Sequence, residues 1–87
     1  MTTFERAERL NAALDKNYKR NDTRRNWSVT IDPVFPQTIE LHLNEPNGLS
    51  ARTLAAFLLK KDPAAKAVHW ITGGMYYTRE TLRRARI

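Results

Sequence analysis

Cysteine is absent from this chain of 87 residues, and glycine occurs only three times. Without cysteine there can be no disulfide framework, no thiolate metal ligand and no thiol nucleophile. No apolar run approaches the roughly 18 residues that a membrane-spanning helix needs. The N-terminal stretch MTTFERAERL also lacks the apolar core of a secretory signal. We therefore expect a cytoplasmic protein that makes no use of a membrane.

Motifs that name an activity are missing as well. The pair Gly73-Gly74 matches neither glycine-rich pattern that cradles phosphates. The only histidines are His42 and His69, and Glu40 lies two residues from the first of them. Two histidines on separate elements without an acidic cluster do not make a metal or acid–base site. We expect no catalytic residue, metal or cofactor; a nuclease that uses either histidine with arginines is the remaining catalytic alternative.

Enough apolar residues are present for a folded core, since hydrophobic types make up 41% of the chain. The length leaves room for a single domain, spanning residues 1–87. The sequence shows no internal repeat, low-complexity tract or linker.

The N-terminal part carries the pattern of an amphipathic helix. Thr2 and Glu5 form the T-x-x-E pair that caps a helix start reciprocally. Apolar residues then recur at spacings of three and four, namely Phe4, Ala7, Leu10, Leu14 and Tyr18. We predict a helix from about Thr3 to Tyr18 that buries this stripe.

Two strands follow, because WSVTID and TIELHL both alternate apolar with polar residues. Antiparallel pairing across the loop PVFPQ puts all their apolar side chains on one face, in the pairs Trp27–Leu43, Val29–Leu41 and Ile31–Ile39. The opposite face is polar and exposed to water, with Ser28, Thr30, Glu40 and His42.

A second helix is predicted after the turn cluster NEPNG. Ser50 is a suitable N-cap, and Leu49 and Leu54 have the spacing of a hydrophobic staple. Asp62-Pro63 should end this helix after Lys61.

The C-terminal part predicts a hairpin and a short helix. AVHWI and MYY are strand formers, and Gly73-Gly74 can supply both positive φ angles of a two-residue turn. Tyr76 and Tyr77 then point to opposite sides, one toward the core and one toward solvent. Thr78 caps a final helix, RETLRRAR, which Leu82 must dock because two turns do not stand alone.

These elements predict the α+β class in the order α-β-β-α-β-(β)-α. We expect an antiparallel sheet of three to four strands with helices packed on one face. Open sheet edges on so small a domain are compatible with a monomer or a homodimer.

The net charge of +6 is concentrated in two blocks, KNYKRNDTRRNW and RETLRRARI, at residues 16–27 and 79–87. Such blocks favour phosphate or acidic partners. The candidate binding residues are Lys16, Lys19, Arg20, Arg24, Arg25, Tyr77, Arg79, Arg83, Arg84 and Arg86. Whether the two blocks share one side of the sheet decides whether they form one surface.

Two binding functions fit this composition. The first is a nucleic-acid-binding accessory protein that contacts the DNA or RNA backbone with little sequence preference. The second is an inhibitor or adaptor of the kind that phages and mobile elements encode, docking on an acidic surface of a host or defence protein complex. In that alternative Tyr76 or Tyr77 anchors the contact.

Overall fold

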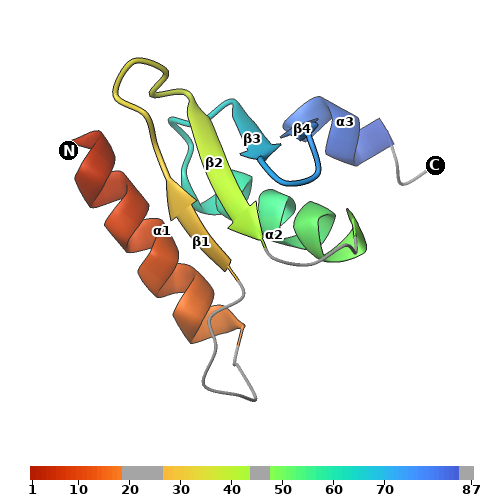
Figure 1. Cartoon of the computed structure of the whole chain (residues 1–87), viewed down its shortest axis with the longest axis horizontal. Helices are drawn as coiled ribbons and strands as arrows, with labels where there is room; N and C mark the ends of the chain where they lie inside the picture. Colours follow the sequence, from red (N-terminus) through yellow and green to blue (C-terminus); the bar gives the residue numbers. More distant parts are fainter. Residues whose placement is uncertain (19–26, 44–47, 85–87) are drawn as a thin grey trace.

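The computed structural model of the chain describes residues 1–18, 27–43 and 48–84 (Figure 1). Its elements follow the predicted order α-β-β-α-β-β-α in one α+β domain. They are α1 (Thr3–Asn17), β1 (Trp27–Thr30), β2 (Thr38–Leu43), α2 (Gly48–Lys61), β3 (Ala67–Trp70), β4 (Met75–Thr78) and α3 (Arg79–Arg84).

The four strands form one sheet in the order β1-β2-β3-β4. The outer pairs are antiparallel, but β2 and β3 run parallel, so the prediction of a wholly antiparallel sheet was wrong at the centre. The reason is the path of the chain, since α2 lies between these strands and returns it to the end where β2 begins. Parallel neighbours require a crossover connection of this kind.

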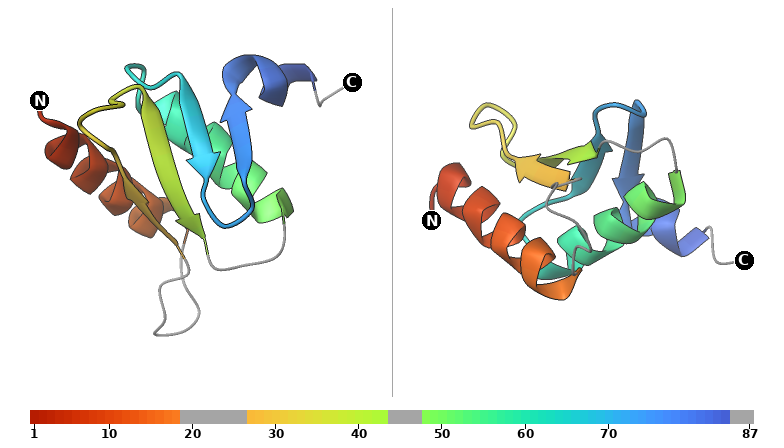
Figure 2. Two further views of the ribbon diagram at one scale, coloured as in Figure 1. Left: turned by 45° about the horizontal axis from the view of Figure 1, so that its top comes forward. Right: turned by 60° about the horizontal axis from the view of Figure 1, so that its bottom comes forward.

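All three helices lie on one side of the sheet, as predicted (Figure 2). Helix α1 packs on β1, α2 crosses behind β2, β3 and β4, and α3 packs against α2 and β4. The core fills the space between the two layers, and its most enclosed side chains are Leu14, Ile39, Leu41, Leu58 and Val68. The other side of the sheet, here called the open sheet face, is covered by no described helix and carries Ser28, Thr30, Thr38, Glu40, His42, His69 and Tyr76.

Helix α1 begins with the predicted reciprocal cap. The Thr2 hydroxyl accepts from the Glu5 backbone N–H at 3.1 Å, and the Glu5 carboxylate accepts from the Thr2 N–H at 2.9 Å. The hydrogen bond from the Thr2 backbone lowers the pKa of Glu5. Leu10 and Leu14 are buried as expected, but Phe4 is 70% exposed. Burial of Phe4 was therefore predicted wrongly, because Phe4 lies beside the face of the helix that Leu10 and Leu14 bury.

The β1–β2 register is the predicted one, with Trp27 opposite Leu43 and Val29 opposite Leu41. Strand β1 ends at Thr30, one residue short of Ile31, which is nevertheless buried in the core. Matching alternation excludes a slip by one residue, which would turn the apolar side chains outward, and the length of the connecting loop selects this register.

Helix α2 differs from the prediction at its N-terminal end and agrees with it at its C-terminal end. The helix begins at Gly48, so Ser50 lies inside its first turn and is not the N-cap. It ends at Lys61 as predicted, and Asp62 and Pro63 form a tight turn in which the Ala65 N–H donates to the Asp62 carbonyl at 3.1 Å.

The β3–β4 turn also differs, because Trp70 pairs with Met75 and four residues, Ile71–Gly74, connect them. Of these four residues only Gly74 has a positive φ, of 65°, so the prediction of a two-residue turn with two positive φ angles was wrong. Gly73 is required for another reason. A Cβ placed there would lie 2.2 Å from the ring of Trp70, which is buried in the core.

Helix α3 is docked and capped as predicted. The Thr78 N–H donates to the Thr81 hydroxyl at 2.9 Å, and the Thr81 N–H donates to the Thr78 hydroxyl at 3.2 Å. Leu82 is half-buried against the core. Reciprocal capping satisfies N–H groups that a helix start leaves unpaired.

We predict that Gly73→Ala destabilises the fold by about 1–3 kcal/mol, because the added methyl group must displace the packed Trp70 ring. Urea unfolding followed by tryptophan fluorescence measures this. Gly74→Ala meets no atom within 4 Å and should show only the cost of its positive φ, about 1–2 kcal/mol. A Gly73→Ala protein as stable as the wild type would contradict the packing described for Trp70.

Candidate functional site

Folding separates the charges onto different sides of the molecule. The four strands contain no lysine or arginine, and Glu40 is their only charged residue. Helices α2 and α3 together contain six lysines and arginines and one acid, Glu80. The basic character of the described chain therefore concentrates on the helical side.

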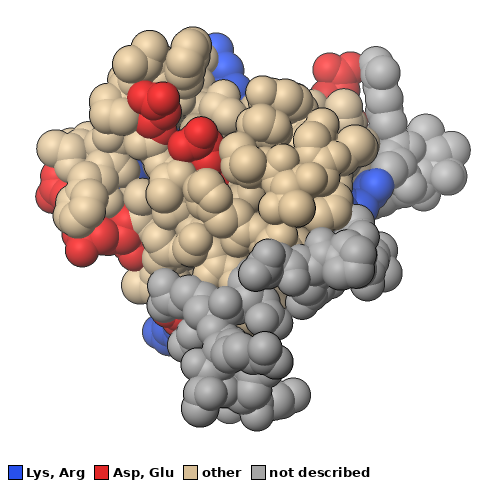
Figure 3. All heavy atoms as spheres, in the orientation of Figure 1, with Lys and Arg blue, Asp and Glu red and all other residues tan. Residues whose placement is uncertain are grey.

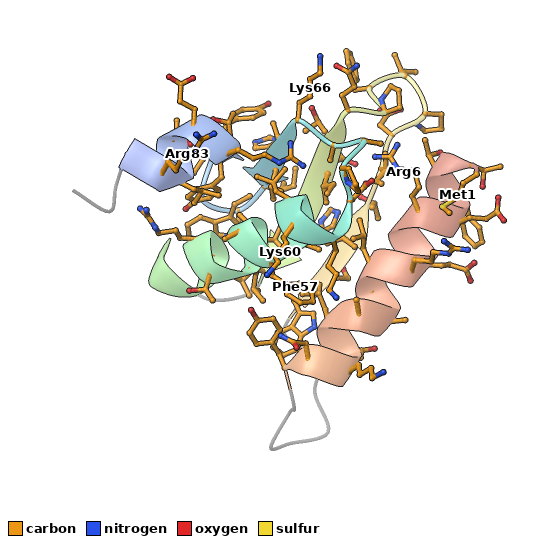
Figure 4. The ribbon with its side chains drawn as sticks, turned by 180° about the vertical axis from the view of Figure 1, so that it is seen from behind. Met1, Arg6, Phe57, Lys60, Lys66 and Arg83 are labelled. Carbon is orange, nitrogen blue, oxygen red and sulfur yellow. The ribbon has the colours of Figure 1, made fainter. Side chains whose placement is uncertain are left out.

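Views from the two sides agree with this separation. Seen from the open sheet face, acidic side chains lie within the surface as well as at its edge, while described lysines and arginines show mainly near the outline (Figure 3). Seen from behind, Lys60 on α2 and Arg83 on α3 come from two neighbouring helices (Figure 4). Both side chains are exposed to solvent.

A groove of about 360 Å³ runs between these two helices, and we call it the α2–α3 groove. Apolar side chains form its floor and cations border it: Ala56, Leu59, Lys60, Arg79, Leu82 and Arg83. Arg52 on α2 donates a hydrogen bond of 3.0 Å to the Leu82 carbonyl, which holds α3 against α2. The positions of the cations are thus set by two packed helices.

Arg79 was predicted to face a partner, and the structure gives its guanidinium another role. Its Nη1 donates to the Ala65 carbonyl at 2.7 Å, and its Nη2 donates to the carbonyls of Leu59 and Asp62 at 2.6 and 3.2 Å. Carbonyls at a helix C-terminus have no partner within the helix and carry partial negative charge. Arg79 caps the end of α2, so its assignment as a phosphate-contacting residue is corrected.

Tyr77 is a second correction. It pairs with Val68 on the sheet and lies in the core, with 8% of its surface exposed. A buried side chain cannot anchor a partner on the surface. Tyr76 is the exposed tyrosine of the pair, as the alternation of a strand requires.

The other predicted residues fall into three groups. Arg83 borders the α2–α3 groove, and Lys16 is exposed in the last turn of α1, on a different helix. Arg84 is the last residue of α3. The remaining candidates lie outside the described residues: Lys19, Arg20, Arg24, Arg25 and Arg86. The question of whether the two basic blocks share one side of the sheet therefore falls outside the described residues too.

Sequence reasoning missed the cations of α2, which are Arg52, Lys60 and Lys61. The stretch from Ser28 to Asp62 is almost neutral when its charges are counted along the chain. In the structure its described acids lie away from the groove, since Asp32 and Glu40 line the pocket on the open sheet face and Asp62 is bound by Arg6. The absence of any acid from the 14 residues of α2 was the available signal.

Comparison of the chain with protein-family models, with curated proteins and with solved structures finds no match. Among the described residues, no helix is long and apolar enough to cross a membrane. In the same part of the chain, no group of three or more histidine, aspartate and glutamate side chains is placed to hold a metal ion.

We predict that Arg79→Lys lowers the free energy of unfolding by about 1–2 kcal/mol, because one ammonium group cannot reach three carbonyls as the guanidinium fork does. Arg83→Lys on the same helix is the matched control and should change stability by less than about 0.5 kcal/mol. Thermal unfolding by circular dichroism gives both values. Equal effects of the two substitutions would show that Arg79 does not cap α2.

Proposed function

We propose that this protein binds nucleic acid through phosphate contacts made by the basic surface of α2 and α3. The observation that carries the proposal is the placement of Lys60 and Arg83 on opposite borders of the α2–α3 groove, on the side of the molecule away from Asp32 and Glu40. Lysine and arginine side chains on neighbouring helices can contact successive phosphates and release their counterions.

Backbone contact fits this groove better than base reading. No aromatic side chain lines it, so bases have no ring on which to stack. Apart from Arg79, which caps α2, its cations are Lys60 and Arg83, and no hydrogen bond among the described residues orients these two toward base edges. Phosphate contacts position a protein on nucleic acid and carry no sequence information. We therefore expect little sequence preference.

Other cations lie next to Lys60 and Arg83 along the chain. Arg84 continues α3, and Arg86 follows it in sequence. Lys61 lies beside Lys60 in the last turn of α2, its ammonium 5.6 Å from the centre of the Phe57 ring. In the proposal, the block containing Lys19, Arg20, Arg24 and Arg25 contributes further phosphate contacts. Alanine substitutions in this block, compared with those at Lys60 and Arg83, measure its separate contribution to binding.

The test is fluorescence anisotropy with labelled single- and double-stranded DNA and RNA over a range of salt concentrations. We expect binding that weakens steeply with salt. Lys60→Ala and Arg83→Ala should each flatten the plot of log affinity against log salt by about one unit, because each removes one phosphate contact. The double charge reversal Lys60→Glu with Arg83→Glu should weaken binding at least about tenfold.

Lys66→Glu combined with Arg9→Glu is the matched control, since it changes the net charge equally at an exposed lysine and an exposed arginine outside the groove. Figure 4 shows Lys66 extending away from α2 and α3. Equal losses in the two double variants would mean that net charge alone causes binding. No binding to any of the four nucleic acids at low salt would overturn the proposal.

The apolar floor of the groove favours a second candidate, an inhibitor or adaptor that docks on an acidic protein surface. Ala56, Leu59 and Leu82 make the floor apolar, and an apolar surface gains nothing from contact with a phosphate backbone. An acidic amphipathic helix would cover it while pairing with Lys60 and Arg83. This candidate would be supported by a saturable one-to-one complex with an acidic protein that Ala56→Gln weakens, while the same substitution leaves nucleic-acid binding unchanged.

A further inference from the structure

A second pocket, of about 200 Å³, lies on the open sheet face beside the β1–β2 loop. Its lining comes from that loop and from β2, β3 and β4, and it combines aromatic rings with carboxylates: Asp32, Phe35, Thr38, Glu40, His69 and Tyr76. No lysine or arginine belongs to this lining. Its chemistry is thus the opposite of that of the α2–α3 groove.

The aromatic wall is built by neighbouring strands. His69 on β3 pairs with Tyr76 on β4, and their rings stack with centroids 4.1 Å apart and an angle of 6° between their planes. This stack fixes the plane of the Tyr76 ring, yet 60% of the Tyr76 surface stays exposed. Phe35, from the loop, is 66% exposed. Exposed aromatic rings held in fixed positions attract cations to their faces.

The two carboxylates are only partly satisfied. Glu40 accepts a hydrogen bond of 2.9 Å from the Thr30 hydroxyl through Oε1, and Asp32 accepts one of 2.9 Å from the Val34 N–H through Oδ1. The second oxygen of each has no hydrogen bond within the described ranges. Neither Asp32 nor Glu40 forms an ion pair with a described cation. The ion pair between Arg6 and Asp62 lies outside the pocket lining.

The loop side of the pocket is held in place before any ligand arrives. The Phe35 N–H donates to the Asp32 carbonyl at 3.0 Å, and the Thr38 N–H donates to the Phe35 carbonyl at 3.2 Å. Arg6 on α1 donates to the Pro36 carbonyl at 2.8 Å and so ties the loop to the helical layer. A ligand therefore has little chain ordering to bring about when it binds.

We infer that this pocket binds an arginine side chain presented by a partner protein. A guanidinium group is planar and weakly hydrated, so it can lie on an aromatic ring while its N–H groups donate to carboxylates. The pocket offers both partners at once, with Tyr76 and Phe35 as rings and Asp32 and Glu40 as acceptors. Phosphate is excluded as a ligand here, because the two carboxylates repel it.

A protein fits the surroundings better than a small free cation. Val34 and Phe35 project from the loop and are both largely exposed. A small ligand in 200 Å³ would cover Phe35 but leave Val34 in water, whereas the surface around an arginine on a protein would cover both. This surface faces away from the α2–α3 groove, so the inference does not depend on nucleic-acid binding.

The test is a titration of ¹⁵N-labelled protein, followed by backbone amide shifts, with the acetylated amides of arginine, lysine and citrulline. Citrulline has nearly the shape of arginine without its charge. Arginine should cause saturable shifts at residues 32–40, 69 and 76, with a dissociation constant on the order of millimolar. Lysine should bind at least about threefold more weakly, since it lacks the planar fork, and citrulline should cause no saturable shift.

Tyr76→Ala and Glu40→Gln should each weaken arginine binding at least about fivefold. Phe4→Ala and Glu8→Gln are the matched controls, because they remove the same kinds of group from exposed positions on α1. Glu40→Gln is close to isosteric, so it keeps the test valid if Tyr76→Ala disturbs the sheet. The inference is overturned if arginine causes no saturable shifts, if citrulline or lysine binds as tightly, or if neither variant weakens binding.

Discussion

The packing of this domain depends on Asp62, the residue that follows the end of α2. The Arg6 guanidinium donates to Asp62 Oδ2 through Nε and Nη2, at 3.1 and 2.7 Å, and brings α1 to the end of α2. On the backbone side of the same residue, Arg79 donates to the Asp62 carbonyl and fixes the start of α3. Asp62 is 8% exposed, so these bonds are shielded from water and removing either partner would leave a costly unpaired group. Three helices from distant parts of the sequence thus meet at one residue.

Local patterns in the sequence sufficed for the elements and for one register. Thr2 and Glu5 mark the start of α1, and the matched alternation of WSVTID and TIELHL together with the short loop between them predicts their pairing. The parallel pairing of β2 with β3 was missed because it follows from the direction in which α2 returns the chain, which no local pattern encodes. The same holds for Gly73, whose requirement comes from contact with the Trp70 ring. In both cases the cause is a contact between elements that are distant from each other or joined by an unpredicted turn.

The candidate site shows the same division. A count of charges along the chain found the arginines of α3 but could not separate Arg79, which caps α2, from Arg83, which faces solvent. It also treated α2 as part of a neutral stretch, since Asp32 and Glu40 cancel Lys60 and Lys61 in sequence. The fold places these acids and bases on opposite sides of the sheet, and the resulting difference between sides is what gives the molecule two chemically distinct surfaces. Charge placement here is a property of the fold.

The parallel contact between β2 and β3 has a consequence for how the domain assembles. Each antiparallel pair joins strands that are near neighbours in the sequence, so the two hairpins can form early and independently. The central pair brings Thr38 beside Ala67, across the whole of α2, and it closes the longest loop of the sheet. Such non-local contacts slow folding, because the chain loses entropy before the contacts form. Joining the two hairpins through α2 is therefore the step that should limit the folding rate.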